Sequence, residues 1–193
     1  HVSADDADFE EIAKCDPGFI EGFYNLIAPV VRSYFRSEVR GLESIPSTGG
    51  ALVVSNHSGG NLTPDPLILQ PAFYRHFGYD RPLYLLAHYG VFYTPLRDYI
   101  KRLGAIHASR PNAREVLNSG AVVLVFPGGD YDAYRPTFSQ NVIDFEGRVG
   151  YVRTAIETGV PIVPTVSIGG QETQLFAARN SWLAKRLGLH RIR

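Results

Sequence analysis

A histidine and a carboxylate stand close together where an apolar run meets a glycine-rich segment. The run Val-Val-Ser-Asn ends at His57, and eight residues later comes Asp65. A histidine titrates near neutrality and can take a proton from a hydroxyl, while a carboxylate can orient the ring and stabilise the imidazolium. The segment is therefore typical of a catalytic base mounted at the end of a rigid element.

Composition limits the classes of function that the chain can serve. The 193 residues are 45% hydrophobic, which is enough for one domain with a substantial core. Nineteen basic and nineteen acidic residues cancel, so no global field favours nucleic acid, and we expect no nucleic-acid partner. The single cysteine, Cys15, excludes an internal disulfide and a cysteine-based zinc site, and the histidine spacings predict no metal site.

Hydrophobic periodicity predicts the elements that position these residues. Residues 19–39 have helical spacing of apolar side chains and predict an amphipathic helix, kinked at Pro29. A buried strand is expected at residues 51–55, directly before His57. Further strands are predicted at residues 83–86, 105–107, 121–126 and 162–168, and helices at 66–76, 89–103, 112–118 and 150–158.

This alternation of strands and helices predicts an α/β fold, with a mixed central sheet flanked by helices and an N-terminal amphipathic helix. We expect residues 1–40 to form the helical segment and residues 41–193 the main domain. The sequence contains no run of about eighteen apolar residues, so it does not predict a membrane span. Because the chain begins without methionine and stops inside a basic helical pattern, we expect it to be a fragment of a longer protein.

Four segments that could carry chemistry follow one another along the chain. They are Asn56 to Asp65, Gly-Ala-Ile-His-Ala-Ser-Arg110, Phe126-Pro-Gly-Gly-Asp130 and Val160-Pro-Ile-Val-Pro164. Together they resemble the four blocks of the glycerolipid and lysophospholipid acyltransferase superfamily, and the likeness spans about residues 20–178. The resemblance implies that residues 41–193 form an acyltransferase domain.

In that family a histidine and an aspartate, usually with four residues between them, form a dyad in which the histidine deprotonates an acceptor hydroxyl. The resemblance makes His57 the base and Asp65 its orienting partner. Here seven residues separate the two, and Leu62 stands where the aspartate is usual. Gly59 and Gly60 would let the longer loop fold back, because glycine adopts strained dihedrals. The alternative is that His57 is a polar loop residue and Asp65 an N-cap for a helix that starts at Pro66.

The resemblance also implies residues that bind substrate. Arg110 corresponds to a clamp for an acceptor phosphate, with a solvated loop arginine as the alternative. Gly128 stands where many members have a glutamate, a pattern similar to the branch that acylates neutral glycerides, and Asp130 is a candidate replacement for that carboxylate. Asp132 and Arg135 belong to a polar-aromatic loop expected to line the acceptor pocket or to be a solvated surface loop. The remaining candidate substrate-binding residues are Asn56, Ser58, Gly59, Gly60, Phe126, Pro127 and Gly129.

The sequence therefore predicts direct acyl transfer, without an acyl-enzyme, from acyl-CoA or acyl carrier protein to a hydroxyl of a lysophospholipid or glycerolipid. No cofactor is expected, since acyl-CoA is a co-substrate. The N-terminal helix and a basic patch at residues 182–193 predict peripheral contact with the cytoplasmic face of the cell membrane. Two alternatives remain open: an inactive lipid-binding protein of the same fold, and an acyl-CoA thioesterase.

Overall fold

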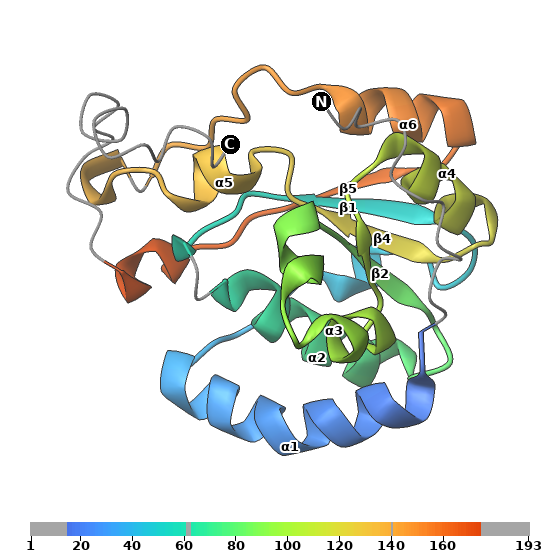
Figure 1. Ribbon diagram of the computed structural model, residues 1–193, viewed down its shortest axis with the longest axis horizontal. Coiled ribbons are helices and arrows are strands. Elements are labelled where there is room, and N and C mark those ends of the chain that lie inside the picture. The colour runs from blue at the N-terminus through green and yellow to red at the C-terminus, as the bar shows by residue number, and fades with distance from the viewer. Residues whose placement is uncertain (1–14, 61–62, 140, 175–193) are drawn as a thin grey trace.

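The computed structural model describes residues 15–60, 63–139 and 141–174. Within these residues, five strands form one sheet in the order β3-β2-β4-β1-β5 (Figure 1). Their bounds are β1 Ala51–Ser55, β2 Leu83–Ala87, β3 Ala105–His107, β4 Val122–Val125 and β5 Ile162–Thr165. The predicted α/β class is confirmed, but the described ladders are all parallel, whereas we expected a mixed sheet. A helix lies in each connection between consecutive strands, and such crossovers return the chain in the same direction.

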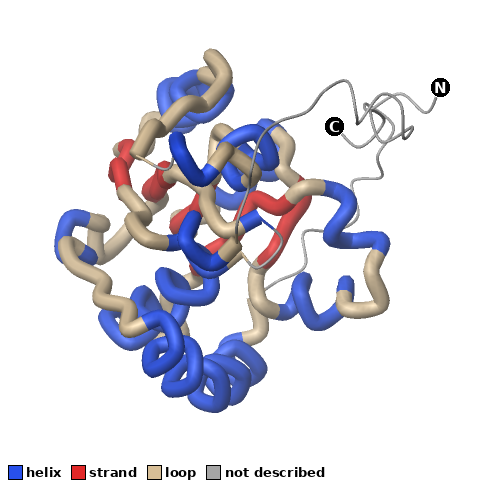
Figure 2. Tube along the Cα trace, turned by 90° about the vertical axis from the view of Figure 1, so that its left-hand side faces the viewer, coloured by secondary structure: helices blue, strands red, loops and turns tan. Residues whose placement is uncertain are grey.

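Helices cover both faces of the sheet, so the strands lie at the centre (Figure 2). The α-helices are α1 Pro17–Phe35, α2 Pro64–Phe77, α3 Arg97–Arg102, α4 Arg110–Asn118, α5 Gly129–Ala133 and α6 Gly150–Thr158. Side chains of β1 alternate between the two cores: Val53 packs on the side of α1 and α2, whereas Leu52 and Val54 pack on the side of α4 and α6. His57 lies two residues after the end of this doubly buried strand.

Local sequence explains where three predicted helices differ from the structure. α1 begins at Pro17, where the Asp16 side chain accepts the Phe19 N–H at 3.0 Å, and it continues through Pro29 to Phe35. α2 begins at Pro64, two residues earlier than predicted. The single helix expected at residues 89–103 is instead a 3-10 helix, η3 Tyr89–Tyr93, followed by α3, because Pro95 lies between them and lacks a backbone N–H.

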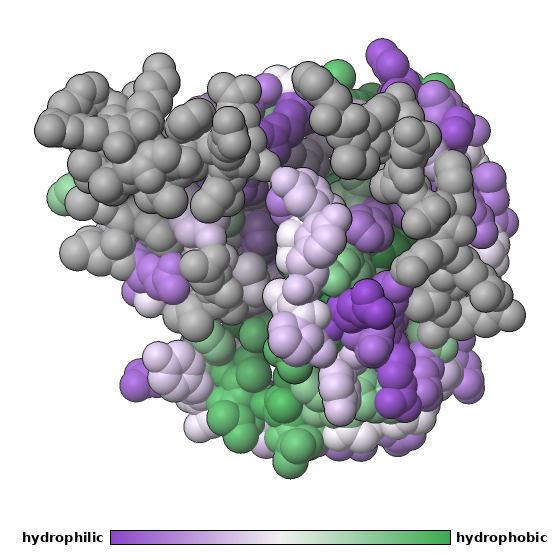
Figure 3. Space-filling view, in the orientation of Figure 1, coloured by the Kyte–Doolittle hydropathy of each residue, from purple (hydrophilic) through white to green (hydrophobic). Residues whose placement is uncertain are grey.

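One face of α1 is part of the core and another is apolar and exposed. Ile20 and Tyr24 are buried, and the Tyr24 hydroxyl donates to Gln70 Oε1 of α2 at 2.8 Å. Leu26, Val30 and Tyr34 are 75%, 68% and 77% exposed. Figure 3 shows hydrophobic residues gathered along the lower edge of the molecule, where α1 lies. Among the described helices, none combines the length and hydropathy that crossing a membrane requires.

Candidate active site

The loop after β1 brings His57 and Asp65 together. His57 Nδ1 lies 2.9 Å from Asp65 Oδ2, although seven residues separate them in the sequence. Gly59 and Gly60 have φ values of +77° and +53°, a backbone conformation that glycine adopts without steric cost. A Cβ on Gly59 would meet the Pro64 ring at 2.6 Å. The glycine pair therefore lets the longer loop fold back, as the sequence predicted.

Asp65 is surrounded by donors. Its carboxylate accepts the backbone N–H and the hydroxyl of Ser58, at 2.7 and 2.8 Å, and the Ser167 hydroxyl at 2.5 Å. Burial alone would raise the pKa of Asp65, but hydrogen bonds from His57, Ser167 and Ser58 outweigh it and hold this pKa below the usual value. Asp65 lies in the first turn of α2, and the N-cap position belongs to Thr63. The capping alternative for Asp65 is therefore wrong.

The imidazole of His57 is fixed in a defined orientation. An ionised Asp65 accepts a hydrogen bond from the Nδ1–H group, which leaves Nε2 as the nitrogen that can take a proton. The ring of Phe126, which follows β4, stacks on the imidazole with centroids 4.4 Å apart and planes 21° from parallel. The side chain of His57 is 15% exposed. The geometry therefore suits proton transfer to and from a molecule in solvent.

A buried ion pair holds the backbone of His57. Asp132 Oδ2 accepts the His57 N–H at 2.5 Å, and Arg135 Nη1 donates to the His57 carbonyl at 2.7 Å. Arg135 also donates to Asp132 Oδ1 at 2.6 Å. Burial raises the pKa of Asp132, and the His57 N–H and the Arg135 guanidinium oppose this shift. Both residues were expected to line the acceptor pocket or to be solvated. Instead they lie beneath the histidine, with Asp132 1% and Arg135 6% exposed.

Three candidate substrate-binding residues of the first block make contacts within the protein. The Asn56 amide donates to the Ser167 carbonyl at 2.9 Å and accepts the Ser167 N–H at 2.7 Å. Ser58 is fully buried and bound to Asp65. Gly59 donates its N–H to Gln171 Oε1 at 3.3 Å. These residues tie the His57 loop to the segment that follows β5, and the described part of the chain contains no cluster of metal-ligating side chains.

Comparison with known proteins identifies the family of this chain. The Acyltransferase family profile matches residues 36–168, more than half of the chain. The chain belongs to the acyltransferase family. The match covers the four blocks, and the resemblance to the glycerolipid acyltransferase superfamily is confirmed.

Two relatives and one solved structure are similar to this chain. An uncharacterized protein of Mycobacterium leprae (strain TN) is 35% identical over 179 residues, 89% of this chain and 48% of the relative. The "DGAT1/2-independent enzyme synthesizing storage lipids" of Bos taurus is 31% identical over 66% of this chain and 37% of that enzyme. The crystal structure of the 1-acyl-sn-glycerophosphate (LPA) acyltransferase PlsC from Thermotoga maritima matches with a TM-score of 0.50 at 23% identity, over 75% of this chain and 55% of that chain, which shows the fold. The chain spans about half the length of the mycobacterial relatives that it matches.

The structure gives a reason for glycine at the third position of the third block, Gly128. A Cβ on Gly128 would lie 2.4 Å from Asp132 Cβ, so no larger residue fits unless Asp132 moves. Glycine at this position and the buried Asp132–Arg135 pair therefore belong together. Asp130, the proposed substitute for the absent glutamate, is exposed, and one of its carboxylate oxygens lies 3.7 Å from Arg148 Nη1.

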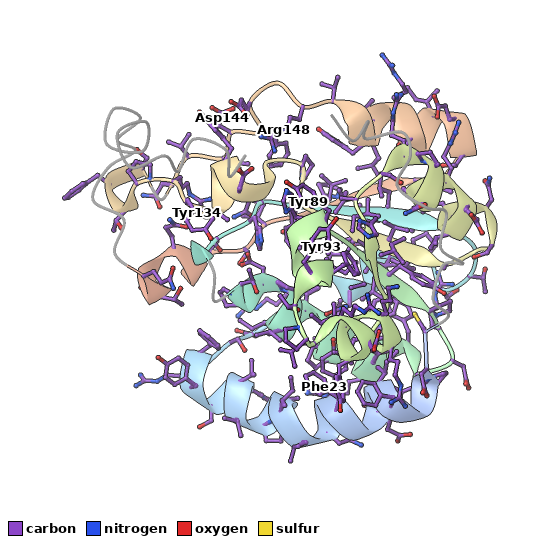
Figure 4. All side chains as sticks on the ribbon, viewed as in Figure 1. Phe23, Tyr89, Tyr93, Tyr134, Asp144 and Arg148 are labelled. Carbon is purple, nitrogen blue, oxygen red and sulfur yellow. The ribbon has the colours of Figure 1, made fainter. Side chains whose placement is uncertain are left out.

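The second block of this chain lies apart from the dyad. Arg110 is the exposed first residue of α4, directly after β3, and β4 and β2 separate β3 from β1 in the sheet. No described contact joins Arg110 to His57 or Asp65. Figure 4 labels Tyr89 and Tyr93 on η3, and Asp144 and Arg148 near α5. Tyr93 is 84% exposed, so this side of the site is open to solvent.

Sequence reasoning missed two supports of the dyad, Ser167 and Gln171. Both follow β5, and they lie beside the His57 loop only because β5 pairs with β1. Gln171 donates through Nε2 to the Arg135 carbonyl at 2.6 Å. It therefore links the segment after β5 to the Asp132–Arg135 ion pair beneath His57. The polar run Ser167-Ile-Gly-Gly-Gln171 directly after the fourth block was the available signal, since carboxyl ends of parallel strands share one edge.

Proposed function

We propose that this chain transfers a fatty acyl group from an acyl thioester, acyl-CoA or acyl carrier protein, to a lipid hydroxyl, with His57 as general base. The observation that carries the proposal is the 2.9 Å contact between His57 and Asp65. Three further hydrogen bonds help to keep the Asp65 carboxylate ionised. An ionised partner makes the imidazolium favourable at the moment when the histidine accepts a proton.

The reaction needs no acyl-enzyme. His57 Nε2 removes the proton of the acceptor hydroxyl, and the oxygen attacks the thioester carbon. The tetrahedral intermediate then collapses, the carbon–sulfur bond breaks, and the leaving thiolate takes the proton back from His57. Cys15 is a poor candidate nucleophile, because burial raises the pKa of its thiol to about 11.

The acceptor that we propose is a hydroxyl of a glycerolipid or lysophospholipid. The Bos taurus relative is described as synthesizing storage lipids, and the third block with Gly128 is similar to the branch that acylates neutral glycerides. The donor brings its own acyl group, so the reaction that we propose requires no cofactor. The exposed apolar residues of α1, Leu26, Val30 and Tyr34, support peripheral contact with the cytoplasmic face of a membrane.

The test is release of free thiol from long-chain acyl-CoA by purified wild type and His57→Ala. Each would be assayed with lysophospholipid, monoacylglycerol, diacylglycerol or no acceptor. We expect acceptor-dependent release that the substitution lowers by a factor of about 10³ or more, since it removes general-base catalysis and its orientation together. Release without acceptor would indicate a thioesterase. No release by folded wild type in any arm would favour the lipid-binding alternative.

A further inference from the structure

A groove between α1 and α2 connects a basic region to the active site. It has a volume of about 650 Å³, and Arg32, Arg36 and Arg75 line it. A second hollow of about 380 Å³ shares Arg36, Ser37, Glu38, Val39 and Ile68 with the first. This second hollow extends to Asp65, Phe126 and Ser167, which hold the His57 ring or its partner. The groove therefore runs along α2 to the catalytic dyad.

The charges in the groove are not neutralised by the described part of the chain. Arg32, Arg36 and Arg75 are exposed, and none forms an ion pair with a described residue. Glu38 also lines the groove, but both of its oxygens accept from Arg40, at 2.9 and 2.8 Å. A cluster of arginines that lacks internal partners is complementary to a ligand with several phosphate charges.

The length of the groove fits a thioester on a pantetheine arm. Asp65 and Arg75 are ten residues apart on α2, and an α-helix rises 1.5 Å per residue, so they are separated by about 15 Å along the axis. In acyl-CoA thirteen bonds join the sulfur to the nearest phosphorus, and an extended chain that gains about 3.5 Å per three bonds covers about 15 Å. Val39 and Ile68, which line both hollows, provide an apolar wall between the two ends.

We propose that this groove binds the donor, with the phosphates of acyl-CoA on Arg32, Arg36 and Arg75 and the pantetheine arm along α2. The thioester then lies beside Phe126, next to the His57 imidazole. This inference deepens the proposed function, because it takes the acyl thioester as the donor and assigns its phosphate-bearing end to a site. Arg110, at the start of α4 beyond the far strand β3, is left for the acceptor.

A substitution of Arg36 can distinguish a role in binding CoA from a role in stabilising the end of α1. It is the C-cap of α1 and has a left-handed backbone with φ +48°, where glycine would be less strained. A basic side chain at a helix C-terminus also interacts favourably with the helix dipole, and that is the structural alternative. Arg36→Gly relieves the backbone while it removes the guanidinium. We expect this variant to keep the unfolding temperature of wild type and to lose affinity for CoA.

Equilibrium binding of CoA, measured by calorimetry, tests the site without catalysis. We expect Arg36→Gly and the double variant Arg32→Gln/Arg75→Gln to weaken CoA binding about tenfold or more, since each removes charge-assisted hydrogen bonds. The nucleotide half alone, adenosine 3′,5′-bisphosphate, should compete with CoA in wild type. Arg114→Gln is the matched control, because Arg114 pairs with Glu157 outside the groove, and it should bind CoA as wild type does.

Each outcome decides the proposal. Equal CoA affinity in the groove variants and the Arg114→Gln control overturns it, as does absence of CoA binding by wild type. If the groove variants instead lose binding to anionic phospholipid vesicles but keep CoA binding, the arginines hold lipid headgroups and the donor site lies elsewhere. If wild type and His57→Ala both bind CoA in the groove while wild type transfers no acyl group to any acceptor, that result supports the CoA site and overturns only the proposed function.

Discussion

The carboxyl edge of the sheet has two halves that are built differently. At the ends of β1, β4 and β5 the His57 loop is held by buried groups, with Asp65 5% and Asp132 1% exposed. At the ends of β2 and β3 the corresponding residues are open, and Tyr93 is 84% and Leu96 60% exposed. The contrast indicates a division of work. In the reaction that we propose, the half that transfers a proton is fixed before substrate arrives, whereas the other half leaves space for a molecule that enters from solvent.

Removing a polar partner costs more free energy in the buried half than in the open half. In the buried half the polar groups around His57 have protein partners, so removing one partner leaves another polar group unsatisfied away from water. In the open half water replaces a lost partner. Substitutions in the buried half should therefore affect folding and catalysis together, and substitutions in the open half should affect substrate binding alone.

The largest effect is expected at the ion pair beneath His57. Arg135→Met leaves Asp132 buried without its guanidinium and should lower the free energy of unfolding by about 3–5 kcal/mol, as breaking one side of a buried pair does. Chemical denaturation measures this change. The matched control is Arg148→Met, because that side chain is 43% exposed, and its effect should stay within about 0.5 kcal/mol.

A double variant sharpens this prediction. Asp132→Asn/Arg135→Met removes both charges, so it should recover part of the lost stability but not the turnover number, because the His57 backbone has lost its two supports. Equal destabilisation by Arg135→Met and Arg148→Met would mean that the buried half is not held by this pair.

Asp65→Asn should lower turnover by a factor of about 10², since a neutral amide no longer stabilises the imidazolium. The acyl-transfer assay measures it, with Asp80→Asn as control, because Asp80 is exposed in the turn after α2. If both substitutions leave turnover unchanged, Asp65 does not act through His57.

The same carboxylate predicts a pH dependence of stability. The pKa of Asp65 is lower in the folded protein than in the unfolded chain, so its stabilising contribution is complete above the unfolded value of about 4 and is lost as pH falls through the folded value. The difference in unfolding free energy between wild type and Asp65→Asn should therefore shrink below about pH 4. A difference that grows with acid would contradict the direction of this shift.

Gly128→Ala is expected to have an intermediate effect. The new Cβ would overlap Asp132, at 2.4 Å from its Cβ, and should destabilise the protein by about 1–3 kcal/mol through overpacking. Gly150→Ala is the control, because a Cβ at this position, the start of α6, would meet nothing within 4 Å. Thermal unfolding of both variants decides whether glycine in the third block is kept for Asp132.

Local patterns in the sequence predicted much of this arrangement, but not the long-range contacts. The strand at residues 51–55 and the helix at 150–158 have the predicted bounds, because a short apolar run determines the strand and helical spacing of apolar residues determines the helix. The support from Ser167 was missed, since it depends on β5 pairing with β1 and joins residues 111 apart. Asp132 and Arg135 were misplaced for a related reason: a charged residue in a polar loop predicts exposure, and only the three-dimensional structure shows that the two neutralise each other beneath His57.

The smallest effect on the fold is expected at Arg110, and this substitution tests the open half directly. Arg110→Ala removes an exposed side chain at the first turn of α4, so the unfolding temperature should not change. If Arg110 binds an acceptor phosphate, the KM for a lysophospholipid acceptor should rise severalfold while the KM for acyl-CoA and the KM for monoacylglycerol stay the same. A lower turnover number with both acceptors would instead place Arg110 in the proton-transfer half, and the two halves of the edge would then be one site.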